Sequence, residues 1–190
     1  MIHYRAKSLR IKTSKMTRPQ QKPSAPQPAT IALVNPLYKP NIGGIENSIY
    51  YLSQELKARG YVPIIITSDA TYDPVDKLPH FEEKYGVKIY RFKSPRNPFR
   101  KIIRIFRFTS KIKELNEKYK FTLVISRHQE STISAYIAGI KNVCFIPPAI
   151  TRKQGNTGRK GLKRFFSPRA FIESYLDVLA VRFASSIFVF

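Results

Sequence analysis

Residues 31–67 read IALVNPLYKPNIGGIENSIYYLSQELKARGYVPIIIT, and this stretch decides the fold of the chain. It begins with an apolar run that ends at Pro36 and closes with a second apolar run, which is typical of two buried strands. Between them, four apolar residues recur at helical spacing: Ile45, Ile49, Leu52 and Leu56. The helix is expected to end at Gly60, because glycine commonly follows the last turn of a helix. A strand, a glycine-containing loop, a helix and a second strand are the repeating unit of a parallel sheet.

The rest of the chain continues this alternation. Further apolar runs predict strands at residues 87–92, 121–126, 142–148 and 185–190. Helical patterns lie between them at residues 99–119, 129–139 and 169–184. Most of the strands are apolar throughout, which is typical of strands covered on both faces. We therefore expect an α/β fold in which helices pack on both faces of a Rossmann-like parallel sheet.

The two later long helices have apolar faces. For residues 99–113 we expect this face to be core, and contact with an anionic membrane surface is the alternative. In the helix at 99–119 the apolar set includes Ile103, Phe106 and Leu115. In the helix at 169–184 the apolar set is Phe171, Tyr175, Leu179 and Phe183. Both patterns predict one buried face and one solvent face.

The net charge of +22 is concentrated in three segments. Residues 1–30, 93–113 and 151–169 carry seven, eight and seven bases, and none of them carries an acid. The remaining 12 bases balance all 12 acids. Such segments attract polyanions, namely anionic lipid headgroups, lipid phosphates or nucleic acid.

The chain divides into two parts by composition. Residues 1–29 are basic and rich in proline, with little to bury, so we expect a disordered tail. Residues 30–190 form the predicted domain. No apolar run approaches the roughly 20 residues that span a bilayer, the start lacks a secretory signal, and Cys144 is the only cysteine. These features favour a cytoplasmic protein and a buried thiol.

The loop before the first helix is the strongest candidate for a binding site. Gly43 and Gly44 follow Asn41 and lie where a strand turns into a helix, so the backbone can approach a ligand closely. The N–H groups at the start of a helix suit a phosphate or a sugar hydroxyl. Glu46 in the first turn favours the helix dipole. A tight turn without a ligand is the alternative.

The string NIGGIENSIYYLSQELKARGYVPIIIT resembles the N-terminal domain of family 4 glycosyltransferases, which have the GT-B fold. FTLVISRH, VCFIPPAI and YLDVLAVRFASSIFVF resemble later segments of that domain in the same order, so the resemblance covers residues 31–190. It implies that Gly43 and Gly44 face the donor diphosphate and the acceptor, and that Glu46 is chiefly structural. A polar residue after the fourth strand, often histidine, lies near the reacting sugar in this family. Arg127 or His128 would take that place here; a loop histidine without a role is the alternative for His128.

The resemblance also implies an activity. The family transfers a sugar from a nucleotide-sugar to an acceptor with retention at the anomeric carbon, usually without a metal or other cofactor. Its C-terminal domain holds the donor, and residues 30–190 contain no equivalent of it. We expect an acceptor-side domain for a glycan or lipid-linked acceptor, inactive alone, which a separate donor-domain chain could complete. The alternatives are a non-catalytic module that keeps the acceptor site and a nucleic-acid-binding basic α/β protein, and the absence of a nucleic-acid motif disfavours the latter.

One further segment mixes bases with aromatic residues. It contains Arg159, Lys160, Lys163, Arg164, Phe165 and Phe166. This mixture suits insertion at an anionic membrane surface or contact with a lipid phosphate, whereas a solvated loop is the alternative. A peripheral position at the inner face of the membrane would follow. The widely spaced His3, His80 and His128 predict no metal site, and the sequence lacks the G-x-G-x-x-G pattern of dinucleotide enzymes.

Overall fold

The computed structural model describes residues 28–72, 78–95, 100–148 and 168–188. The chain order is β1 (Thr30–Val34), α1 (Gly44–Ala58), β2 (Val62–Ser68), β3 (Phe81–Lys84), β4 (Val87–Phe92), α2 (Arg100–Tyr119), β5 (Leu123–Ser126), α3 (Gln129–Ile137), β6 (Val143–Phe145), α5 (Pro168–Phe183) and β7 (Ser186–Ile187). Each predicted strand and helix is present at its place. The predicted tail at 1–29 and the segment at 158–166 lie almost wholly outside the described residues.

The strands form one sheet in the order β3-β4-β2-β1-β5-β6-β7. Every neighbouring pair is parallel except β3 and β4. The predicted α/β fold with a mostly parallel, Rossmann-like sheet is therefore confirmed. Because β1 lies in the middle of the sheet, its carboxyl end is next to those of β2 and β5.

The antiparallel strand β3 was not predicted. Its sequence FEEK is mostly charged and exposed, so it lacks the apolar pattern of the other strands. A two-residue turn joins it to β4, with φ of 59° at Tyr85 and 67° at Gly86. Two positive φ values in succession give the tight hairpin turn that matches the twist of antiparallel strands.

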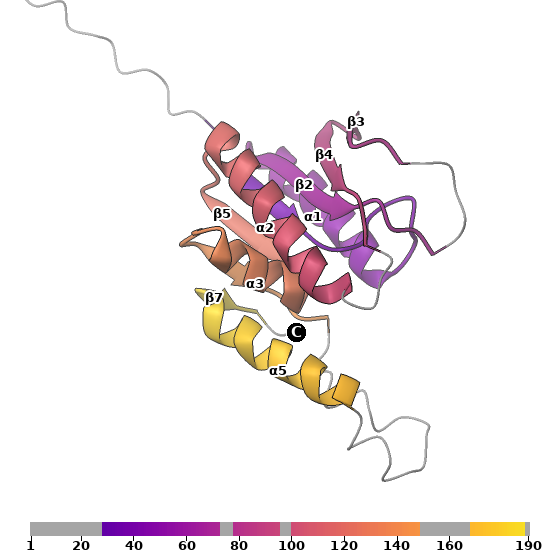
Figure 1. Cartoon of the computed structure of the whole chain (residues 1–190). Coiled ribbons are helices and arrows are strands. Elements are labelled where there is room, and N and C mark those ends of the chain that lie inside the picture. The colour runs from indigo at the N-terminus through magenta and orange to yellow at the C-terminus, as the bar shows by residue number, and fades with distance from the viewer. Residues whose placement is uncertain (1–27, 73–77, 96–99, 149–167, 189–190) are drawn as a thin grey trace, which may run out of the picture.

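Helices cover both faces of the sheet, as predicted (Figure 1). On one face α1 packs over Ile31, Leu33, Ile65 and Ile89. On the other face α2 and α3 pack on the strand residues that alternate with these, including Ala32, Val34 and Ile64. α5 packs beside α3 through Leu176, Leu179 and Phe183. Because each central strand is buried on both sides, its sequence is apolar at consecutive positions.

The predicted apolar faces of α2 and α5 each contain an exposed residue. In α2, Phe108, Ile112 and Leu115 are buried, but Phe106 is 66% exposed. In α5, Leu179 and Phe183 pack inward, but Tyr175 is 57% exposed. Both helices carry apolar residues around more than half of their circumference, so periodicity alone did not identify the face that meets the sheet. No helix in the described residues is long and apolar enough to cross a membrane.

Candidate functional site

The glycine loop joins the carboxyl end of β1 to the start of α1. Gly43 is the N-cap residue of α1 in an extended conformation, with φ −166° and ψ 173°, and no side chain caps the helix. Its carbonyl accepts the first helical bond from the backbone N–H of Asn47, at 3.0 Å. The helix therefore begins with backbone N–H groups that no side chain caps, as an anion or hydroxyl ligand requires.

The two glycines have different surroundings. A Cβ at Gly43 would collide with the carboxylate of Glu46, whose side chain is 3% exposed and turns back toward the loop. A Cβ at Gly44 would meet no atom of the chain within 4 Å. A side chain at position 43 would therefore require the Glu46 carboxylate to move, whereas the space beside Gly44 is open to a ligand. Glu46 lies in the first turn of α1, as predicted, and the role predicted for it stays a prediction.

Asn41 anchors this loop. Its side chain is buried, and its amide nitrogen donates to the carbonyls of Tyr38 and Ala70, both at 2.9 Å. Its amide oxygen accepts from the backbone N–H of Tyr72 at 2.8 Å. These bonds tie the loop after β1 to the chain that follows β2. The ligand contact predicted for Asn41 stays a prediction, and its bonds favour a structural role.

Arg91 holds the loop after β1 through a hydrogen bond to its backbone. The sequence did not indicate this role. It lies near the end of β4 and is 2% exposed. One terminal nitrogen donates to the carbonyl of Lys39 at 2.9 Å and lies 2.6 Å from the carboxylate of Glu82. Burial, followed by the nearby tyrosine hydroxyls, raises the pKa of Tyr38 beside it to about 12. In the sequence, Arg91 stands out only as a base within an apolar strand. Its role could not be predicted because Lys39, to which it donates, lies in a distant segment.

Arg91 belongs to a row of four polar side chains at the carboxyl ends of adjacent strands, of which three are buried and Arg127 is half-buried. Along the sheet the row is Arg91, Thr67, Asn35 and Arg127, after or near the ends of β4, β2, β1 and β5. All four continue the strand positions that face α1. Among the described residues, every buried side-chain nitrogen or oxygen without a hydrogen-bond partner belongs to these four. Under-paired buried polar groups are rare, and their concentration at one edge favours a functional site there.

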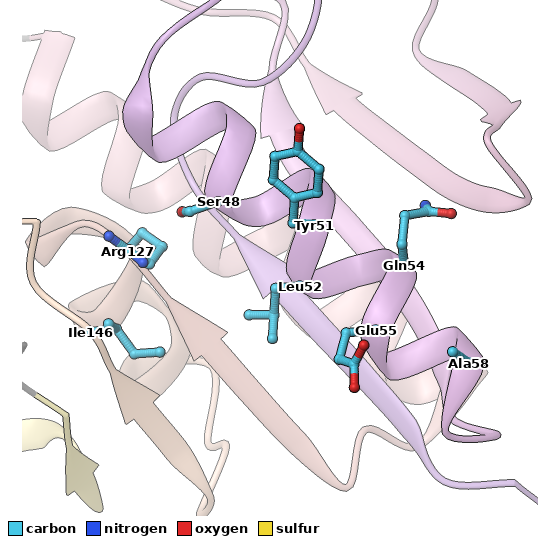
Figure 2. A pocket seen from close by; sticks show the side chains of 8 residues that line it. All are labelled: Ser48, Tyr51, Leu52, Gln54, Glu55, Ala58, Arg127 and Ile146. Carbon is cyan, nitrogen blue, oxygen red and sulfur yellow. The ribbon is translucent and has the colours of Figure 1, made fainter.

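Arg127 is the member of the row closest to open space. It lines a groove of about 750 Å³ together with Ile146 and residues along α1, namely Ser48, Tyr51, Leu52, Gln54, Glu55 and Ala58 (Figure 2). Burial lowers the pKa of its guanidinium. An arginine in this setting gains stability from an anion.

His128 begins α3. Its Nδ1 accepts a hydrogen bond from the backbone N–H of Glu130 at 3.3 Å, so the imidazole caps the helix. A neutral ring that accepts at Nδ1 carries its proton on Nε2. The sequence predicted a contact with the sugar for this residue, and that contact stays a prediction. The structure adds a capping role that fixes the orientation of the ring.

The next turn is held by an ion pair that the sequence did not reveal. Both carboxylate oxygens of Glu130 accept from Arg104 of α2, and the side chain of Glu130 is 1% exposed. The pair fixes the start of α3 against α2. It therefore supports the segment that carries Arg127 and His128.

The structure places the glycine loop and the segment with Arg127 and His128 at the carboxyl ends of neighbouring strands. β1 and β5 are neighbours, and the backbone N–H of Arg127 donates to the carbonyl of Val34 at 3.4 Å. Gly43 and Gly44 thus begin the helix that follows β1, while Arg127 and His128 follow the adjacent strand. In parallel α/β sheets, ligands bind at this edge. Arg159, Lys160, Lys163, Arg164, Phe165 and Phe166 lie outside the described residues.

Comparison with known proteins identifies the family and agrees with the fold. The model of Glycosyltransferase Family 4 matches residues 42–171. A sucrose-phosphate synthase from Thermosynechococcus elongatus has a similar fold, with a TM-score of 0.60 and 13% identity over 84% of this chain and 41% of its own. A glycosyltransferase from Rickettsia africae aligns with a TM-score of 0.41 and 20% identity over 85% of this chain and 42% of its own.

This chain thus spans less than half the length of either structure. No curated protein matches the sequence. The family match covers most of the chain and includes Gly43, Gly44, Arg127 and α3. The chain belongs to Glycosyltransferase Family 4.

Proposed function

We propose that this chain is the acceptor-side domain of a retaining glycosyltransferase that transfers a sugar from a nucleotide-sugar to a glycan or a lipid-linked acceptor. The observation that carries the proposal is the open glycine loop at the start of α1, one strand away from Arg127 at the same sheet edge. Family membership supports glycosyl transfer in general. The acceptor side and the stereochemistry are our inference.

The chemistry of the edge suits such a transfer. The bond between the sugar and the diphosphate breaks while a bond to an acceptor oxygen forms, so negative charge grows on the diphosphate. The first N–H groups of α1 and the guanidinium of Arg127 offer positive charge to that group. The imidazole of His128 is a candidate hydrogen-bond partner for a sugar hydroxyl. Positioned donors of this kind act mainly by stabilising charge in the transition state.

We further propose that the donor is held by a second domain and that this chain is inactive alone. Support comes from its span of 41% of the sucrose-phosphate synthase chain, a length that leaves room for another domain in that protein. A separate chain could supply the domain in trans. Nucleotide-sugar is then a substrate of the assembly, and no cofactor is required.

The test is a transfer assay with labelled nucleotide-sugars and a lipid and glycan extract as acceptor. We expect no product from the purified chain and measurable product after co-expression with a family 4 donor domain. In that assembly Gly44→Val and Arg127→Ala should each lower the rate about tenfold or more. Arg59→Ala is the matched control, because this arginine is exposed at the far end of α1. Turnover by the chain alone, or full activity of both site variants, would refute the proposal.

A non-catalytic module that binds the acceptor is the second candidate. The same open loop supports it, since acceptor binding alone needs only the groove and the sheet edge. Saturable binding of the extract that Gly44→Val abolishes, without transfer in any assembly, would favour this module. Retention on random-sequence DNA at physiological salt would instead favour nucleic-acid binding.

A further inference from the structure

The N-terminal half of α2 exposes two large apolar side chains. Ile102 is 57% exposed and Phe106 is 66% exposed, and they lie one helical turn apart on the same side. The core contacts of α2 come from other positions, namely Phe108, Ile112 and Leu115. Burial within the described domain therefore does not account for Ile102 and Phe106.

Exposed bases lie on the solvent-facing part of the same helix. Arg100, Arg107 and Lys113 are exposed on the same helix, and residues 93–113 contain no acid. The first acid of α2 is Glu114, which pairs with Lys111. We call Arg100, Ile102, Phe106, Arg107 and Lys113 the basic apolar face of α2.

The placement of these charges opposes the stability of the isolated helix. The first turn of α2 holds Arg100 and Lys101 and no acid. The start of a helix carries partial positive charge, which favours acids and disfavours bases. A negatively charged partner reverses this disadvantage.

We propose that the basic apolar face of α2 docks on the surface of an anionic lipid bilayer. At such a surface Ile102 and Phe106 enter the boundary between headgroups and acyl chains, while Arg100, Arg107 and Lys113 meet the headgroup charge. The phosphates of a nucleic acid would bind the bases, but they offer no apolar environment in which Ile102 could be buried. The combination of exposed apolar and basic side chains thus favours a bilayer.

The docking orients the domain. α2 follows β4 in a parallel strand order, so its first turn lies at the same sheet edge as the glycine loop (Figure 1). Contact through the first turns of α2 brings that edge close to the bilayer, where a lipid-linked acceptor would be within reach. This consequence rests on the proposed function, whereas the docking itself does not.

The chain contains no tryptophan, so a single introduced one reports on one position. We would compare Phe106→Trp with Tyr51→Trp, whose site is 68% exposed on α1 at the opposite face of the sheet. Both proteins are mixed with vesicles of phosphatidylcholine alone or with added phosphatidylglycerol. We expect the tryptophan at position 106 to shift its emission to the blue on anionic vesicles and to be quenched by brominated acyl chains. The tryptophan at position 51 should do neither.

Two variants in the Phe106→Trp background separate apolar from charge contributions. Ile102→Ser removes apolar contact, and Arg100→Gln with Lys113→Gln removes charge; each should weaken the partition measured at position 106 several-fold. All of these positions are exposed, and thermal unfolding checks that the fold is kept. Solvent-like emission at position 106 on vesicles that sediment with the protein would overturn the proposal, as would an equal response to neutral vesicles. An equal blue shift with duplex DNA would also overturn it. No readout involves sugar transfer, so failure here is distinct from failure of the proposed function.

Discussion

At the scale of single residues, Gly43 and Gly44 differ in the space that surrounds them. Gly43 faces the buried carboxylate of Glu46, and Gly44 faces empty space. We expect Gly43→Ala to lower the free energy of unfolding by about 1–2 kcal/mol, because the Glu46 side chain must move. Gly44→Ala should leave it unchanged or raise it by up to about 1 kcal/mol, because alanine favours a helix. Urea unfolding followed by circular dichroism measures both.

The same two variants distinguish packing from ligand approach. In an active assembly Gly44→Ala should impair transfer even though the domain is as stable as the wild type. Equal stability of the two variants would contradict the collision inferred at Gly43. Normal transfer by Gly44→Ala would show that no ligand approaches the loop this closely.

At the scale of elements, α3 depends on a partner helix for its position. Glu130 is buried at its first turn, and Arg104 of α2 is its ion-pair partner. Arg104→Ala leaves a buried carboxylate without a counter-ion, which should lower the free energy of unfolding by about 3 kcal/mol. Lys113→Ala on the same helix is exposed and should change it by less than about 0.5 kcal/mol. Denaturant unfolding of the two variants tests this, and similar values for both would contradict a stabilising pair.

At the scale of the whole molecule, the sheet order predicts a gradient of protection. β1 lies between β2 and β5 and is covered on both faces, whereas β7 is one of the two edge strands of the described sheet and is exposed. Backbone amides exchange through local opening, which is rarer where burial and pairing are greatest. In hydrogen exchange followed by mass spectrometry, peptides over residues 31–34 should exchange most slowly and those over 186–187 quickly. Slow exchange in β7 would mean that this edge is covered.

The sequence by itself determined the alternation of elements. Short apolar runs rich in β-branched residues, such as residues 62–68, favour buried strands, and the apolar period of residues 45–56 predicts a helix between them. The helical period also predicted α2 but not which of its apolar residues stay outside, so Phe106 was wrongly assigned to the core. β3 was missed because three of its four residues are charged.

The tertiary structure alone decided how the candidate site is held together. The local sequence pattern does place Gly43 and Gly44 at the start of a helix and Arg127 and His128 after a strand. These placements depend only on residues that are close in the sequence. Arg91 beneath Lys39, and Arg104 on Glu130, join residues 52 and 26 positions apart. Such pairs depend on strand order and helix packing, which are set by the burial of the whole sheet rather than by any local pattern.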